Sequence, residues 1–418
     1  MERRLNAPIN HSIQTVIQMV SVLYLLVWSV APPLQMDLIF RLLALGLAFV
    51  WFVIEFLRHF EFTMMQIWCA LFMFAVAAIG YFSRGFDGVM SEIAVYMMVL
   101  AFFINIYSTD NWQSYRIVVP ITLGLLCFFN FRTYSALVQD TTLARRLVRD
   151  TEDLYVYMRQ GVGGYGLVYP QVCIAPVVYA WALKSFEHNK FYTLLGAVWS
   201  VSFWMVLNLA GYSIAIITSA IALVVLLFYR RQSVLPAFFI AAGLILAMVL
   251  LLVYVEGFRN LVLQIFEGTK IVRKIEDLLS TAEGETADSF ATRAERYWWS
   301  LESCLQYPLI GGRLFGARIG GHSELLDTFA QYGVWGGVPV AFMIFYTPNA
   351  FKASSPSITV RATANAHIMA ISLFSLFDPF VFQVYFPLMV LCPIMYSDIY
   401  KWRTREYEYS LDSQSDSA

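Results

Sequence analysis

The chain has 418 residues, of which 59% are hydrophobic and 14% are charged, and its formal net charge is -1. Soluble globular chains carry roughly 25% charged residues, so lipid must cover much of this protein's exterior. The nearly neutral charge gives no reason to expect nucleic acid, which requires a basic stripe for its phosphates. The five cysteines are scattered, with neither a disulfide framework nor a metal-ligand spacing, so no metal site is predicted.

The apolar stretches predict an all-α protein with about twelve membrane-spanning helices, since about 20 mostly apolar residues cross the hydrocarbon core. The predicted spans are 13–31, 38–57, 62–82, 89–107, 115–131, 165–184, 191–210, 212–229, 234–255, 323–346, 362–378 and 381–398. They divide the chain into nine spans within 1–255, an outer loop at 256–322, three spans within 323–400 and a tail at 401–418. The first span has full length and no small-residue cleavage pattern, so it is not predicted to be a signal peptide.

Positive charges in the short loops predict that both chain ends face the cytoplasm. Every predicted inner segment is basic: Arg3 and Arg4, Arg58 and His59, Arg116, Lys184 and Lys190, Arg230 and Arg231, Lys352 and Arg361, and Lys401, Arg403 and Arg405. The short outer loops are poor in positive charge, with Arg84 as the main exception. The chain is therefore predicted to be a multi-pass membrane protein with the lipid bilayer as its environment.

Two longer outer segments depart from this pattern. The first, 132–164, contains no lysine but holds Arg132, Arg145, Arg146, Arg149 and Arg159. The second, 256–322, is predicted to begin with an amphipathic helix at 258–279 that lies in the membrane interface. A polar break at 280–288 and a second helix at about 290–306 follow, and the second helix ends before Pro308.

Arg293 and Arg296 are predicted to share a face of the second helix, because residues three apart on a helix are neighbours. Two guanidinium forks on one face can close on a single anion such as a pyrophosphate. Tyr297, Trp298 and Trp299 follow directly and would anchor the helix at the height of lipid phosphates. The alternative is that both arginines pair with nearby glutamates or with lipid head groups.

A second group of polar residues, His322, Ser323, Glu324 and Asp327, lies where the long outer loop meets the tenth predicted span. Here an imidazole meets two carboxylates at the first turn of a helix, with access to water and substrate, so His322, Glu324 and Asp327 are candidate catalytic residues. The alternative is a capping or lipid-facing histidine.

Several glycines flank this group. Gly311, Gly312, Gly320 and Gly321 lie in the loop, and Gly333, Gly336 and Gly337 lie in the following span. The span glycines are predicted to let the helix pack closely or bend. No strand precedes these glycines and no Lys-Ser/Thr follows them, so they do not form a nucleotide-binding loop, and no cofactor is predicted.

The stretch 293–337 resembles the bacterial O-antigen polymerase (Wzy) and O-antigen ligase (WaaL) superfamily. The family pattern of Arg, Trp, Pro-Leu-x-Gly, His-Ser and Gly-x-x-Gly corresponds here to Arg293, Trp298, 308–311, 322–323 and 333–336. The family often places an arginine at the outer turn between the seventh and eighth spans, where this chain has Gly211, Tyr212 and Ser213.

The resemblance implies a metal-independent glycosyltransferase of the bacterial inner membrane, with a fold like that of GT-C enzymes and a large late periplasmic loop. Its donor would be an undecaprenyl-pyrophosphate-linked oligosaccharide, and a chain-length regulator is an implied partner. His322 would be the base that activates the acceptor hydroxyl. The pyrophosphate ligands would be Arg293, Arg296 and, in place of the missing arginine, members of the set Arg132, Arg145, Arg146 and Arg149.

Three functions remain open from the sequence. The acidic residues after His322 favour a polymerase that joins repeat units, over a ligase that transfers glycan to the lipid A core. A retaining double displacement would need a nucleophilic carboxylate paired with an acid, whereas the set of a histidine and arginines suits direct attack with inversion at the anomeric carbon. Twelve spans also fit a transporter of lipid-linked oligosaccharides, although such proteins commonly have internal repeats and a binding site at the midplane.

Overall fold

The computed structural model describes residues 13–58, 67–86, 112–140, 142–149, 151–228, 243, 247, 250–265, 272, 276, 288–355, 357–380 and 382–401. Within these ranges the regular structure is helical, with no β-strand. The predicted span 89–107, much of the span 234–255, most of the second half of the helix predicted at 258–279, nearly all of the polar break and the tail beyond 401 lie outside the described residues.

Six helices are long and apolar enough to cross a membrane: Ile67–Phe86, α6 (Val118–Gln139), α9 (Tyr165–Ser185), α10 (Lys190–Ala210), α16 (Glu324–Ser354) and α17 (Ile358–Phe377). Three further predicted spans contain shorter apolar stretches, which lie in α2 (Ile13–Val30), α4 (Leu38–Arg58) and α11 (Ser213–Phe228). The span predicted at 381–398 is a helical run of α18 (Phe382–Phe386), a π-helical turn at Pro387–Leu391 and residues 392–401. These helices confirm a helical chain with several candidate spans.

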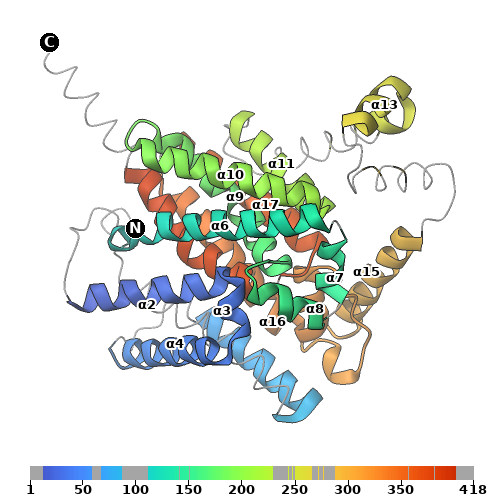
Figure 1. Cartoon of the computed structure of the whole chain (residues 1–418). Helices are drawn as coiled ribbons and strands as arrows, with labels where there is room; N and C mark the ends of the chain where they lie inside the picture. Colours follow the sequence, from blue (N-terminus) through green and yellow to red (C-terminus); the bar gives the residue numbers. More distant parts are fainter. Residues whose placement is uncertain are drawn as a thin grey trace, which may run out of the picture.

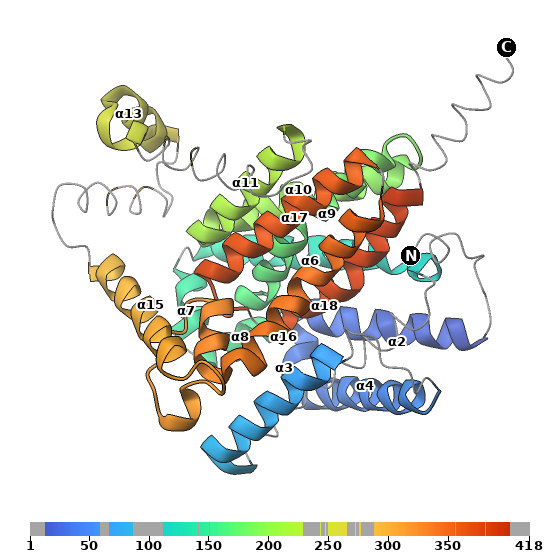
Figure 2. The ribbon, with the colours of Figure 1, turned by 180° about the vertical axis from the view of Figure 1, so that it is seen from behind.

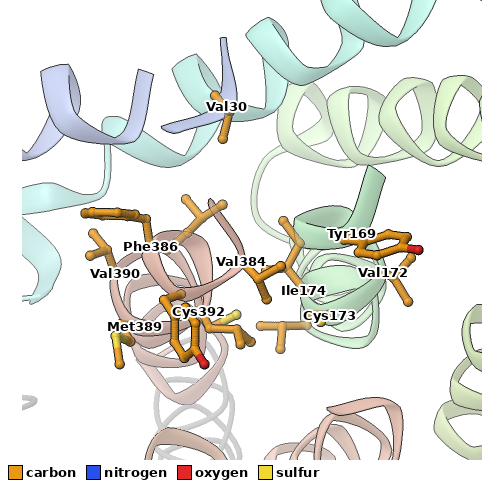
Figure 3. Close-up of a cluster of buried hydrophobic side chains, with 14 of the residues drawn as sticks. Val30, Tyr169, Val172, Cys173, Ile174, Val384, Phe386, Met389, Val390 and Cys392 are labelled. Atoms are coloured by element: carbon orange, nitrogen blue, oxygen red, sulfur yellow. The ribbon is translucent and has the colours of Figure 1, made fainter. Parts of the chain in front are cut away.

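The long helices pack side by side in one bundle, in which α10 contacts α6 and α9, and α17 contacts α9, α11 and α16 (Figures 1 and 2). Apolar side chains fill its centre, among them Val172, Ile174, Val384 and Val390, which contribute to the buried cluster in Figure 3. A buried amide pair ties the layers together, because Asn130 of α6 and Gln171 of α9 exchange two hydrogen bonds of 2.8 Å. Such satisfied polar pairs fix how apolar helices face one another.

The helix ends meet in two groups at opposite ends of the bundle. At one end, Tyr165 at the start of α9 lies 4.8 Å, ring to ring, from Tyr212 between α10 and α11. The same end holds the start of α16 and the end of α17, joined by a 3.0 Å hydrogen bond from Ser323 Oγ to Ser375 O. At the other end, Arg116 just before α6 and Trp181 near the end of α9 both contact Asp398, and the Arg116 guanidinium lies over the Tyr192 ring at the start of α10. Consecutive helices α9 and α10 therefore run in opposite directions, and the topology expected from the loop charges stays a prediction.

The segment predicted as the loop 132–164 is mostly helical. α6 continues to Gln139, so Arg132 lies on the helix, and α7 (Leu143–Arg149) and α8 (Thr151–Arg159) follow. Arg132 ends the apolar run, but residues 132–139 contain neither Gly nor Pro. The helix therefore continues beyond the apolar run. α8 packs against α3 (Pro32–Met36), which joins α2 to α4.

Two helices of the predicted outer loop are described. α15 (Asp288–Gln306) agrees closely with the helix expected at 290–306 and packs against α16. α13 (Glu256–Ile265) covers part of the helix expected at 258–279 and stands apart from the bundle in both views (Figures 1 and 2). In both views α15 and α7 lie at the same end of the bundle.

Gly333 bends α16 and creates the seat for the loop that precedes it. Its φ of 62° and ψ of -157° are available only to glycine, and a side chain there would meet Leu309 O at 2.2 Å. Across this bend, Val334 N donates to Pro308 O at 2.8 Å. The bend divides α16 into a short first segment, Glu324 to Tyr332, and a longer apolar segment. The longer segment is by itself long enough to cross a bilayer.

Candidate functional site

The candidate site is built where α15 lies against the first turns of α16. Arg296, Ser300 and Ser303 recur on α15 at spacings of four and three, so they share one helical face. Ser300 and Ser303 are buried on this face, and Arg296 is half-buried at its edge. This polar face of α15 therefore packs against α16 and against the loop that carries His322.

His322 receives a hydrogen bond at its ring from α15. Arg296 Nη1 lies 2.9 Å from His322 Nε2, and the Tyr297 hydroxyl donates to the His322 carbonyl at 3.2 Å. A guanidinium has only donors, so Nε2 must be the acceptor and the proton of the neutral ring resides on Nδ1. The structure therefore holds His322 in a defined tautomer with the basic nitrogen turned toward Arg296.

The charges around His322 keep it neutral. Burial lowers the pKa of His322 from its ordinary value, the charges of Arg296 and Arg293 lower it further, and Asp327 opposes the shift. Burial, with the nearby charge of Asp378, also raises the pKa of Tyr297 to about 12, so its hydroxyl remains a donor. Both predicted arginines thus act on one neutral imidazole.

Neither Arg293 nor Arg296 forms an ion pair with a carboxylate among the described residues. Glu302, one of the glutamates that the alternative interpretation would place against them, accepts instead from Gln306 at 3.0 Å. Two positive groups that lack a carboxylate partner and converge on a neutral histidine favour an anion between them.

Asp327 is buried, and both of its oxygens accept hydrogen bonds. Ser300 Oγ donates to Oδ1, and the Ser323 backbone N–H donates to Oδ2 at 2.7 Å. Ser323 is also the N-cap of α16, since its hydroxyl accepts from Leu326 N at 3.2 Å. Ser323 and Asp327 therefore form a local structural contact at the start of α16.

Glu324 joins α16 to the turn after α17. Its Oε2 accepts from Phe380 N at 2.8 Å, its Oε1 accepts from the Tyr385 hydroxyl, and its backbone N–H donates to Asp378 O at 3.2 Å. Glu324 and Asp327, both predicted as catalytic, lie next to His322 in the chain with their carboxylates bonded to protein donors. Of the three predicted catalytic residues, only His322 faces the arginines.

Arg132 and Arg146, two of the candidate arginines of the 132–164 segment, have local partners. Arg132 Nη2 donates to Gln160 O at 3.0 Å, and Arg146 forms ion pairs with Asp140 at 2.7 Å and Asp153 at 3.5 Å. Hydrogen bonds from Thr142, together with Arg146, lower the pKa of Asp140. The side chains of Arg145 and Arg149 lie outside the described residues, so their predicted role stays a prediction.

Sequence reasoning missed a cluster of tyrosines beside the site. Tyr165 stacks on Tyr169 with ring centroids 4.5 Å apart, and Tyr212 contacts both rings. Asp378 lies close enough for its charge to act on Tyr169, Tyr212 and Tyr297. These residues come from three separate turns, so no sequence spacing connects them.

Sequence reasoning also missed Arg318, although it lies within the matched stretch. Its guanidinium stands 5.5 Å from the centre of the Trp299 ring, which places a further positive charge beside α15. The signal available in the sequence was Trp299, an aromatic ring over which an arginine can lie. No group of three or more His, Cys, Asp and Glu that could hold a metal ion occurs among the described residues.

No protein-family model matches this chain, and no curated protein matches it.

Proposed function

We propose that this protein is an O-antigen or surface-polysaccharide polymerase of the bacterial inner membrane. It would join undecaprenyl-pyrophosphate-linked repeat units at the periplasmic face, where the twelve-span topology expected from the sequence would place the 256–322 loop. The observation that carries the proposal is the convergence of Arg293 and Arg296, neither paired with a carboxylate among the described residues, on the neutral ring of His322.

The donor pyrophosphate would bind between Arg293 and Arg296. A phosphate oxygen forms a stronger, charge-assisted hydrogen bond to a guanidinium than a neutral imidazole does, so Arg296 would exchange its bond to Nε2 for one to the donor. When the glycosidic bond to the pyrophosphate breaks, negative charge grows on that leaving group. The two arginines would stabilise this charge more than they stabilise the bound donor, which lowers the barrier.

His322 would then act as the general base. Release of Arg296 exposes the Nε2 lone pair, which takes the proton of the acceptor hydroxyl as that oxygen attacks the anomeric carbon. One bond forms from the acceptor oxygen to the carbon, and the bond from the carbon to the phosphate oxygen breaks. A single displacement inverts the configuration at the anomeric carbon and releases undecaprenyl pyrophosphate.

The acceptor sugar would approach from the side of Asp378 and the tyrosines. Tyr165 and Tyr212 are half-buried and Asp378 is half-buried at the α17–α18 turn, so aromatic faces and a carboxylate border the same end of the bundle as His322. Sugar rings combine apolar faces with hydroxyl groups, and this pair of surfaces suits both.

A ligase that transfers glycan to the lipid A core is the second candidate, because it would use the same base and the same pyrophosphate site. The transporter is less well supported. The charged contacts described above lie toward the two ends of the bundle, and apolar side chains fill the centre between the described helices (Figure 3).

A gel of surface polysaccharide separates these functions. A deletion strain that retains a single repeat on the lipid A core, and recovers long chains with the wild-type gene but not with His322→Ala, supports a polymerase. Absence of repeats on the core with accumulation of undecaprenyl-linked polymer would identify a ligase. Accumulation of undecaprenyl-linked single repeats on the cytoplasmic face would identify a transporter.

A further inference from the structure

We propose that Ser300 and Asp327 are positioning residues that clamp the four-residue segment 320–323 and thereby hold His322 against Arg296. This inference rests on the proposed function, because it assigns a role in the same reaction. It also gives Asp327 a different role. The sequence suggested a catalytic carboxylate, whereas in this proposal Asp327 positions the side chain of His322.

The clamp holds the segment on both sides of His322. Gly320 N donates to Ser300 Oγ at 2.8 Å, and Ser323 N donates to Asp327 Oδ2 at 2.7 Å. Ser300 Oγ in turn donates to Asp327 Oδ1, so one serine–carboxylate pair receives both backbone N–H groups. Only Gly321 and His322 lie between the two anchored residues.

The segment lies directly on the backbone of α15. A side chain at position 320 would meet Arg296 O at 2.2 Å, so glycine is required for this approach. Gly320 thus contacts the backbone of the very residue whose guanidinium binds the His322 ring. The clamp therefore fixes the distance between a donor on α15 and an acceptor on the loop.

Burial makes the clamp stiff and keeps it away from substrate. Ser300 is 0% exposed and Asp327 is 5% exposed. A buried carboxylate is tolerated when donors satisfy it, and Asp327 has two donors and a place in the first turns of α16, where the helix dipole favours negative charge. Both oxygens accept hydrogen bonds from protein groups, and these contacts direct the carboxylate at Ser300 and Ser323.

Ser303 provides a matched control on the same helix. It is also buried, at 2% exposed, and its hydroxyl donates to Ala330 O of α16 at 2.9 Å. Ser303 therefore joins α15 to α16 with one hydrogen bond, as Ser300 does, but it has no hydrogen bond to the segment 320–323. Substitution of either serine by alanine removes one buried hydroxyl.

The test measures polymer formation by the purified full-length protein in lipid vesicles, with an undecaprenyl-pyrophosphate-linked repeat as substrate. Ser300→Ala should lower kcat about 10- to 100-fold, since a displacement of about 1 Å at a reacting group has an effect of this size, with KM within about twofold. Asp327→Asn should do the same, because an amide NH2 group replaces one of the two acceptor oxygens and faces one of the two donors. Ser303→Ala should remain within about twofold of the wild type.

A double-variant cycle separates positioning from a general loss of structure. If Ser300 acts through His322, Ser300→Ala should have no further effect in a His322→Ala background. The pH profile supplies a second readout, since the charged groups near His322 are Arg293 and Arg296 on α15 and Asp327 on α16. A displaced ring in Ser300→Ala should move the acidic limb of kcat relative to that of Ser303→Ala.

Equal activities of Ser300→Ala and Ser303→Ala, or fully additive effects in the cycle, would overturn the clamp. A His322→Ala protein with wild-type activity would instead overturn the proposed function. The two failures are distinguishable, because an inactive His322→Ala beside a fully active Ser300→Ala contradicts the clamp alone.

Discussion

The arginines at the two ends of the helix bundle have opposite kinds of partner. At the end away from His322, Arg116 Nε lies 3.0 Å from Asp398, Trp181 Nε1 donates to the same carboxylate at 3.1 Å, and the guanidinium stands over the Tyr192 ring. Every partner there is part of the protein. At the other end, Arg293 and Arg296 meet a neutral histidine. An arginine neutralised by a carboxylate stabilises a fold, whereas arginines with no carboxylate partner in the described part of the chain favour a site for an anion.

The largest effect in this comparison should come from His322→Ala. Removal of a general base typically slows a reaction about 10²- to 10⁴-fold, so polymer formation should fall by that factor while the protein remains in the membrane. His188→Ala, which changes an exposed histidine at the opposite end between α9 and α10, should retain full activity. Turnover of lipid-linked repeat by equal amounts of each protein checks this, and equal rates would remove His322 from the mechanism.

Arg296→Lys keeps the positive charge but loses the two-pronged fork. We expect kcat/KM to fall about 10-fold or more, because a lysine ammonium binds a phosphate as a point charge. Arg116→Lys at the opposite end should leave kcat/KM unchanged in the folded fraction. A similar loss in both variants would mean that Arg296 has the same structural role as Arg116.

Arg296→Gln should also shift the pH dependence. The neutral ring is the base, so activity falls as the pH drops through the pKa of His322. The charge of Arg296 lowers this pKa, and its removal should raise the pKa and move the acidic limb of kcat to higher pH. Arg318→Gln is the control, because Arg318 is not among the charges that shift His322. An unchanged acidic limb in Arg296→Gln would contradict the assigned contact.

Asp398→Asn tests the neutralised end. The carboxylate accepts charge-assisted hydrogen bonds, so the variant should lose about 2 kcal/mol in the free energy of unfolding, with turnover per folded molecule unchanged. Chemical denaturation in detergent measures the first quantity and a lipid-vesicle assay the second. A specific loss of turnover without loss of stability would show that this end also takes part in the reaction.

The smallest effect should follow from Arg146→Ala. Its partners Asp140 and Asp153 are part of the protein, and all three side chains are substantially exposed, so stability should change by less than about 1 kcal/mol. Polymer formation should stay within about threefold of the wild type. A loss comparable to that of Arg296→Lys would return Arg146 to the pyrophosphate site that the sequence suggested.

Local patterns in the sequence predicted the parts of the site that lie close together in the chain. The spacing of Arg293 and Arg296 fixes them on one helix, and the helix end predicted before Pro308 agrees with the end of α15 at Gln306. Gly333 was expected to let the helix pack closely or bend, with close packing favoured, and its backbone angles show a bend. Helical periodicity and turn residues are local features, so they predict the positions of helix ends and bends to within a few residues.

The contacts that give these residues their roles depend on separations that no local pattern encodes. Ser300 and Asp327 are 27 positions apart, and they meet only because the loop returns over Gly320 onto α15. Asp378 joins the site through the turn after α17. Arg132 was assigned to a loop because the first charged residue after the apolar run was taken as the end of the helix. The helix in fact continues to Gln139.

The central claim is that Arg293, Arg296 and His322 form one site for transfer from a lipid-linked pyrophosphate. The most direct test gives purified protein in lipid vesicles an undecaprenyl-pyrophosphate-linked repeat unit and measures polymer and free undecaprenyl pyrophosphate together. The wild type should produce both in step, and the His322→Ala and Arg293→Ala/Arg296→Ala proteins should produce neither above background. Polymer formed by either variant at the wild-type rate, or lipid-linked repeat moved across the bilayer without release of undecaprenyl pyrophosphate, would contradict the claim.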